Sequence, residues 1–151
     1  MVTSIKRIVL VSPVWNDSDR LEVFGLQLAE SLSVANHSIW WIIADDGSDE
    51  SERVSYVNLL LRFQAIYSDV ELMHFSPRSR KGGAVYQAWD RCPQADYYAF
   101  VDADGAVSPE LILSLLRRVV DADGACGVVG VRARDQRLTV RRRILRSLAD
   151  D

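Results

Sequence analysis

The sequence has little of what several protein classes depend on. It contains 2 cysteines, Cys92 and Cys126, and their spacing matches no metal motif. Reduced thiols in a cytosolic chain are the simplest expectation, and a disulfide between the two is the alternative. No apolar run approaches the roughly 18–20 residues that cross a bilayer. The apolar stretch near the N-terminus is too short for a signal peptide and lacks a small-residue cleavage site.

Basic residues are not in excess either. The chain has 18 Lys and Arg against 21 Asp and Glu, a net charge of -3, so its overall charge gives no reason to expect nucleic acid as a partner. Its 151 residues, 48% of them hydrophobic, suffice for a globular domain with a core. Internal repeats, low-complexity segments and linkers are absent from the sequence. We therefore expect a single domain over residues 1–151.

Short apolar runs rich in Val, Ile, Trp and Tyr alternate with segments of helical spacing. Several of the runs are apolar almost throughout, as is typical of strands covered on both faces. The expected strands are Arg7–Val11, Ile39–Ala44, Val70–Phe75, Tyr97–Val101 and Gly127–Val131. This alternation predicts an α/β fold, a three-layer Rossmann-like, open and mostly parallel sheet flanked by helices.

Four helices are expected between and after these strands. The fourth begins at Ser108, whose hydroxyl can cap it, with Pro109 in the first helical position. The third is expected over Gly83–Asp90. The apolar positions at helical spacing are Leu21, Phe24, Leu28 and Leu32 in the first helix, Val54, Val57, Leu60 and Leu61 in the second, and Leu111, Ile112, Leu115, Leu116 and Val119 in the fourth.

Polar residues follow four of the expected strands. In open α/β sheets, ligands bind beyond the carboxyl ends of the strands, so these residues would converge on one edge. The four segments are Ser12-Pro13-Val14-Trp15-Asn16-Asp17, Asp45-Asp46-Gly47-Ser48, the group Arg78, Arg80, Lys81, Gly82 and Gly83, and Asp102-Ala103-Asp104.

Asp102 and Asp104 stand one residue apart after an apolar run. Two carboxylates that turn toward one point repel each other, and a divalent cation relieves that repulsion. Oxygen ligands suit Mg²⁺ or Mn²⁺, which also bind substrate phosphates. The pair therefore indicates half of a metal–diphosphate site, although Asp and Gly are also typical of a simple turn.

Other sites that use acidic or glycine-rich loops fit less well. A calcium EF-hand loop counted from Asp102 would need oxygen ligands where Ala106 and Leu113 stand. An aspartate-nucleophile phosphatase needs a downstream lysine, and no lysine follows Asp104. The P-loop spacing is absent. A nucleotidyltransferase on a related sheet should have a glycine-rich loop after its first strand, whereas SPVWND contains no glycine.

The remaining strand ends have two interpretations each. Asp46 can accept a hydrogen bond from a base N–H, or Asp45 and Asp46 can form an Asx-turn before the next helix. Trp15 can stack on a base or pack as an ordinary aromatic residue. The RKGG segment can offer cations and bare amides to an anion at a helix start, or be a solvated basic turn.

Four segments in this order, VSPVWND, ADDGSDE, RKGGAVYQAW and FVDADGAVSPELI, resemble the signature of the family 2 glycosyltransferases, which have the GT-A fold. KGGAV is most similar to the polyprenyl-phosphate branch, the enzymes like dolichyl-phosphate mannose synthase. The resemblance runs from about Ile8 to Leu116 and continues more loosely to the C-terminus. It implies a UDP- or GDP-sugar donor held through Mg²⁺ or Mn²⁺, and a polyprenyl-phosphate or carbohydrate acceptor.

The resemblance also implies a role for each matching position. Pro13 and Trp15 would line the base pocket, and Asp17 matches an acidic position of the first motif. Asp46 would contact the base with support from Asp45. The segment Arg80, Lys81 and Gly82 would face the nucleotide or its diphosphate, Asp102 would touch ribose or metal, and Asp104 would hold the metal.

The sequence departs from the family in its later part, which usually supplies the acceptor pocket and, in inverting enzymes, a general base. The late acidic residues are Asp135, Asp150 and Asp151, and none of them is nominated as that base. No tryptophan follows Trp89. We therefore expect a transferase domain that is C-terminally incomplete. The alternative is a non-catalytic nucleotide-binding or interaction module that retains only the donor half.

The C-terminal stretch VRARDQRLTVRRRILRSL is rich in arginine. If it is helical, Val140, Ile144 and Leu148 share one face, and a basic amphipathic helix can lie on an anionic membrane surface. The same helix can instead pack on the domain with its arginines in water. We expect no nucleic-acid binding, because no aromatic residues are interleaved with the arginines. The expected location is cytoplasmic, with the inner face of the membrane as the place of any lipid contact.

Overall fold

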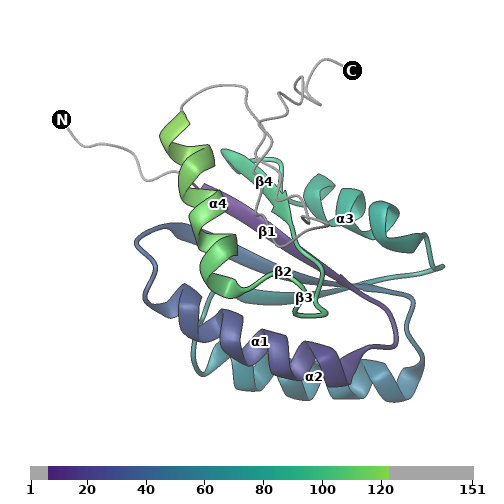
Figure 1. The fold of residues 1–151 in the computed structure, drawn as a ribbon. Helices are drawn as coiled ribbons and strands as arrows, with labels where there is room; N and C mark the ends of the chain where they lie inside the picture. Colours follow the sequence, from purple (N-terminus) through teal and green to yellow (C-terminus); the bar gives the residue numbers. More distant parts are fainter. Residues whose placement is uncertain (1–6, 123–151) are drawn as a thin grey trace, which may run out of the picture.

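The computed structural model describes residues 7–122 (Figure 1). In these residues strands and helices alternate. The order is β1 (Arg7–Val14), α1 (Ser18–Ser33), β2 (Ser38–Asp46), α2 (Glu50–Gln64), β3 (Val70–Phe75), α3 (Arg80–Asp90), β4 (Tyr97–Phe100) and α4 (Pro109–Ala122). The predicted strand Gly127–Val131, the basic C-terminal helix and Cys126 lie outside the described residues.

The four described strands form one parallel sheet in the order β3-β2-β1-β4. The register pairs Val14 of β1 with Asp45 of β2, and Asp46 of β2 with Phe75 of β3. All four carboxyl ends therefore lie along one edge of the sheet. The predicted parallel α/β fold is confirmed.

Helices cover both faces of the sheet and make three layers. α1, α2 and α4 lie on one face, and α3 lies on the other (Figure 1). On the three-helix face, Trp41 of β2 packs against Phe63 of α2 with ring centroids 5.3 Å apart. On the α3 face, Val9 and Val11 of β1 pack with Ala84 and other α3 residues. Two hydrophobic clusters thus hold the strands between the helices.

The helix predictions have mixed outcomes. In α1, the four predicted apolar positions are buried. In α4, the Ser108 hydroxyl accepts the Leu111 N–H at 3.3 Å, which confirms the predicted cap. The predicted apolar face of α2 is largely wrong, because Val54, Val57 and Leu61 are exposed, whereas Leu60 is partly buried against the core. Its buried residues are Tyr56, Leu59 and Phe63.

Several element boundaries differ from the prediction in a way that matters for the site. β1 continues to Val14 and β2 to Asp46, so Pro13, Asp45 and Asp46 belong to strands rather than to loops. β4 ends at Phe100. α3 begins at Arg80 rather than at Gly83, which places the whole RKGG segment in its first turn.

No helix within residues 7–122 combines the length and the apolar character that a membrane span requires.

Candidate functional site

The four polar strand ends lie along the carboxyl edge of the sheet. β1 leads into Trp15, β2 ends at Asp46, and β4 is followed by Asp102. Two contacts connect segments that are distant in the sequence. The Arg78 guanidinium lies over the Trp15 ring at 3.6 Å, and the Lys81 ammonium lies 2.8 Å from Asp102 Oδ1. The structure therefore brings all four sequence motifs together at one edge.

The adjacent aspartates at the end of β2 point to opposite faces of the sheet, because successive side chains of a strand alternate. Asp46 lies on the α3 face, where its Oδ1 accepts the Ser79 N–H at 2.7 Å and Arg78 Nε lies 3.9 Å from Oδ2. Asp45 lies on the other face. It accepts the Ser48 N–H at 3.0 Å and contacts His74 Nδ1 at 2.7 Å. Of the two, Asp46 alone faces the segment that leads into α3.

Trp15 presents an aromatic face at this edge. The residue is 44% exposed, and the stacked Arg78 also lies beside Asp46. Gly47 permits this approach, because a Cβ there would lie 3.1 Å from the Arg78 amide nitrogen and its φ is +73°. Pro13, partly exposed, belongs to the same strand as Val9 and Val11, whose side chains face α3. The Arg78 guanidinium thus lies between the ring of Trp15 and the carboxylate of Asp46.

The first turn of α3 offers positive charge and open backbone. Arg80 and Lys81 supply cations next to helix amides that have no carbonyl partner within the helix. A Cβ at Gly82 would meet no atom within 4 Å, whereas a Cβ at Gly83 would lie 2.6 Å from the Ser79 side chain. Packing therefore requires glycine at Gly83 but leaves free space over Gly82, where an anion can approach the backbone.

Asp102 and Asp104 are held by different partners. Asp102 forms the ion pair with Lys81, while Asp104 Oδ1 accepts the Ala106 N–H at 2.9 Å in a turn. The pKa of the Arg20 guanidinium is raised by the hydrogen bond and the charge of Asp17, and more weakly by the charge of Asp104. Separate contacts therefore hold the two carboxylates, with Asp102 bound to Lys81 of α3 and Asp104 bound within its own turn.

Within residues 7–122, no group of three or more His, Cys, Asp or Glu side chains is arranged to hold a metal. Mg²⁺ does not need such a group, since it binds through one or two carboxylates together with waters and substrate phosphates. Asp102 is partly exposed and Asp104 is exposed, so both carboxylates are accessible from solvent. Carboxylate oxygens are ligands of the kind that Mg²⁺ and Mn²⁺ prefer, so the chemistry of the two side chains suits such an ion, although no contact among residues 7–122 joins the two carboxylates.

The loops after β1 and β2 are bonded to each other. Asn16 has a positive φ of 45°, and its side chain both donates to Asp49 Oδ2 at 3.1 Å and accepts the Asp49 N–H at 2.8 Å. Its own N–H donates to Ser48 Oγ at 2.9 Å. Asp17 is paired with Arg20 at 2.8 Å. These bonds fix the position of Trp15 relative to the end of β2.

Two residues of this region were given no role from the sequence, although Arg78 was expected at the carboxyl edge. Arg78 lies just before the RKGG segment, and its place after an expected strand was the available signal. His74 was assigned no role, yet the β2–β3 register places it opposite Asp45. The alternation of strand residues puts both side chains on the same face, a signal that requires the register to be known.

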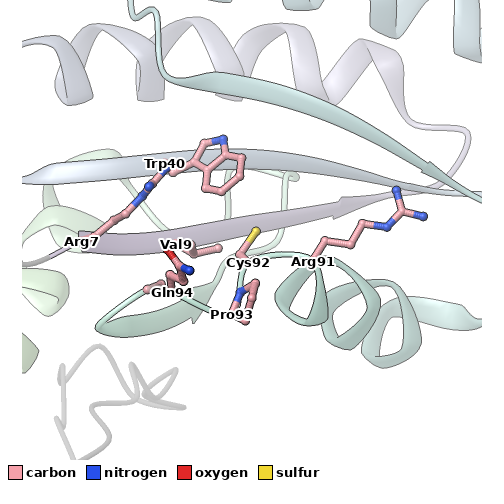
Figure 2. A pocket seen from close by; sticks show the side chains of 8 residues that line it. Arg7, Val9, Trp40, Arg91, Cys92, Pro93 and Gln94 are labelled. Atoms are coloured by element: carbon pink, nitrogen blue, oxygen red, sulfur yellow. The ribbon is translucent and has the colours of Figure 1, made fainter.

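A separate hollow of about 250 Å³ lies away from these residues. It is formed near the beginning of β1, by Arg7 and Val9 together with Trp40 and the segment that follows α3 (Figure 2). Cys92 borders it, and burial raises the pKa of that thiol. None of the predicted site residues lines this hollow. The candidate site is therefore the opposite, carboxyl edge of the sheet.

Comparison with solved structures supports the fold. The mannosyltransferase PcManGT from Pyrobaculum calidifontis, in complex with GDP-Man and Mn²⁺, is similar with a TM-score of 0.64 and 17% identity over 87% of this chain and 37% of that one. Residues 1–349 of TarS from S. aureus give a TM-score of 0.58 and 16% identity over 91% of this chain and 39% of that one. The chain thus spans well under half the length of both.

Sequence comparison gives the family. No curated protein sequence matches the chain. The profile of the family described as Glycosyl transferase family 2 matches residues 11–149. Since that match covers most of the sequence, the chain belongs to glycosyl transferase family 2.

Proposed function

We propose that residues 1–151 form a single nucleotide-sugar-binding domain of a glycosyltransferase. The donor is a UDP- or GDP-sugar, bound at the carboxyl edge of the sheet on the side of α3. The observation that carries the proposal is the juxtaposition of Trp15, Arg78 and Asp46. An aromatic face suits stacking with a base, and a carboxylate beside a guanidinium suits a base edge that has both N–H donors and carbonyl acceptors.

The diphosphate of the donor is assigned to the start of α3. Its negative charge is favoured there by Arg80, Lys81 and the helix amides, and the open space over Gly82 permits close approach to the backbone. Asp102 and Asp104 would hold Mg²⁺ or Mn²⁺ against the same diphosphate. When bound, such a dication stabilises the negative charge that develops on the leaving diphosphate. PcManGT, a structural neighbour, is in complex with GDP-Man and Mn²⁺, which supports a donor and a metal of this kind.

The acceptor is a polyprenyl phosphate or a carbohydrate. The polyprenyl branch is favoured by the resemblance of the KGGAV segment of α3 to that branch. A lipid-phosphate acceptor would also agree with a cytoplasmic domain that touches the inner face of the membrane through its basic C-terminal segment.

Calorimetry with UDP and GDP, each with and without Mn²⁺, tests donor binding. We expect one of the two nucleotides to bind in the presence of Mn²⁺ and to bind at least about tenfold more weakly without it. Absence of binding by both nucleotides would contradict the proposal. An assay of sugar transfer from the corresponding UDP- or GDP-sugar to a polyprenyl phosphate then tests the acceptor.

A non-catalytic nucleotide-binding module is the second candidate. Nucleotide binding without sugar transfer or donor hydrolysis would support the module. Transfer by the chain alone would support the enzyme.

A further inference from the structure

The ion pair between Lys81 and Asp102 joins two motifs to which the proposed function gives separate tasks. Lys81 lies in the first turn of α3, and Asp102 lies directly beyond β4 and Val101. Their Nζ and Oδ1 atoms are 2.8 Å apart, and the side chains are 58% and 41% exposed. Lys81, which is assigned to the diphosphate site, therefore contacts an oxygen of Asp102, which is assigned to the metal site.

The Lys81 ammonium and a dication would compete for the Asp102 carboxylate. A dication on Asp102 would replace the ammonium at Oδ1, and the two positive charges would repel each other at this distance. The ammonium then needs another anion nearby. The diphosphate that binds with the dication would lie at the same carboxyl edge of the sheet, next to the helix turn that carries Lys81.

We propose that Lys81 holds Asp102 while the site is without donor and transfers to the diphosphate when the metal–nucleotide complex binds. This inference rests on the proposed donor site. Its consequence is that binding of the metal and of the nucleotide is coupled through one side chain. The metal alone must displace Lys81 without providing it with a new partner, whereas the metal with a diphosphate provides one.

The properties of this pair suit such an exchange. Lysine is a compact charge on a flexible four-carbon stem, so it can follow an anion that arrives nearby. Both side chains are largely in water, and exposed ion pairs of this type are weak. The contact can therefore keep Asp102 from binding a free dication tightly without preventing its release to the metal–nucleotide complex.

The first test compares metal and nucleotide binding in Lys81→Met and in wild type, by Mn²⁺ paramagnetic resonance and by calorimetry. With Mn²⁺ alone, Lys81→Met should bind the ion roughly two- to fivefold more tightly, the range of an exposed ion pair. With Mn²⁺ present, the same variant should bind UDP or GDP at least about fivefold more weakly, because the diphosphate loses a cation. The two changes are opposite in sign.

Arg62→Met is the matched control. It also removes one positive charge from the surface, but Arg62 lies near the end of α2 and contacts Glu22 at 3.5 Å. Arg62→Met should change neither the affinity for Mn²⁺ nor the affinity for the nucleotide. Equal effects of the two variants would show that net charge, rather than the contact with Asp102, controls metal binding, and would overturn the inference.

A second test observes Lys81 directly. The sequence contains two lysines, Lys6 and Lys81, so the side-chain resonances of ¹³C,¹⁵N-labelled lysine are few enough to assign through Lys81→Met. The Lys81 signal should shift when Mg²⁺ is added with UDP or GDP, and the other lysine signal serves as reference. An unmoved Lys81 signal, together with unchanged constants in Lys81→Met, overturns the inference while leaving the donor proposal standing. If wild type binds neither nucleotide with metal, both fail.

Discussion

At the scale of single residues, the two aspartates that end β2 have different surroundings although they are adjacent. Asp45 and Asp46 are 1% and 2% exposed, so both carboxylates are removed from water. Asp45 contacts the Ser48 amide and the His74 ring on the three-helix face, which fixes the turn after β2. Asp46 lies beside Arg78 on the α3 face. The first aspartate therefore stabilises the turn after β2, and the second lies on the face of the proposed donor site, beside Arg78.

Asp45→Ala should lower the free energy of unfolding by about 1–3 kcal/mol, because it leaves the buried Ser48 N–H and the His74 ring without their partner. The nucleotide affinity of the folded fraction should stay within about twofold of wild type. Asp46→Asn should instead weaken nucleotide binding and leave the free energy of unfolding nearly unchanged. It retains an acceptor for Ser79 but loses the charge beside Arg78. Urea denaturation and calorimetry measure the two quantities, and a stability loss confined to Asp46→Asn would contradict this division.

Trp15 belongs to the same scale, because its role depends on one exposed ring. Trp15→Ala should weaken nucleotide binding about tenfold, since stacking of a base on an aromatic ring contributes about 1–3 kcal/mol. The free energy of unfolding should change little, because the side chain is half exposed. Tyr86→Ala removes another exposed aromatic ring, on α3, and is the control. Unchanged nucleotide affinity in Trp15→Ala would exclude stacking on this ring.

At the scale of elements, α2 shows the limit of sequence patterns. Its sequence contains two stripes at helical spacing, one through Val54, Val57 and Leu61 and another through Tyr56, Leu59 and Phe63. The prediction chose the first stripe together with Leu60. The structure buries the second stripe and, of the predicted residues, partly buries Leu60. Aromatic rings bury more area than valine, and Phe63 packs against Trp41 of β2. The choice between the stripes depends on what the sheet offers, which the sequence of α2 alone does not show.

The candidate site was predictable to the extent that it depends on strand ends. Apolar runs that end in SPVWND, DDGS and DADG are visible in the sequence, and the rule for parallel sheets places them on one edge. The contact of Lys81 with Asp102 depends instead on the position of α3, which lies on the face opposite α1 and α2. The pair Asp45–His74 depends on the register of β2 and β3. Both are consequences of tertiary packing between distant segments.

Two helical glycines have different surroundings: Gly25 is packed against another helix, and Gly82 has free space over it. A Cβ at Gly25 of α1 would lie 2.2 Å from Phe63 Cζ, so Gly25→Ala should separate α1 from α2 and lower the free energy of unfolding by about 1–3 kcal/mol. Gly82→Ala should raise it by about 0.5–1 kcal/mol, because alanine loses less conformational freedom than glycine in a helix.

Nucleotide affinity gives these two variants a second readout. Gly82→Ala should weaken UDP or GDP binding, since the new methyl group lies where a diphosphate is proposed to approach the backbone. In Gly25→Ala, the nucleotide affinity of the folded fraction should be unchanged, because Phe63 of α2 packs in the core on the three-helix face. Wild-type affinity in Gly82→Ala would show that the diphosphate does not contact this turn.

At the scale of the whole molecule, the sheet is unequally covered among the described residues. α1, α2 and α4 shield one face, while α3 alone packs on the other. The proposed donor site lies at the open end of the α3 face, so the helix that supports the sheet core also supplies the cations of the site. Binding of a donor should therefore stabilise the α3 face in particular.

The strands should also differ in stability. Within residues 7–122, β1 and β2 each pair with two strands, whereas β4 pairs with β1 alone. Tyr98 and Phe100 of β4 are 40% and 56% exposed, while the centre of β1 is fully buried. Backbone amides of β1 and β2 should therefore exchange only on global unfolding, and those of β4 should exchange at least roughly tenfold faster through local opening.

Native-state hydrogen exchange followed by NMR measures this difference. If the β4 amides that point away from β1 are as protected as those of β1, β4 is not an edge strand in solution, because these amides have no strand partner within residues 7–122. Its outer side would then be paired with a segment outside residues 7–122 or with a second copy of the chain. Exchange repeated over a tenfold range of protein concentration distinguishes the two, since only pairing between copies makes the protection depend on concentration.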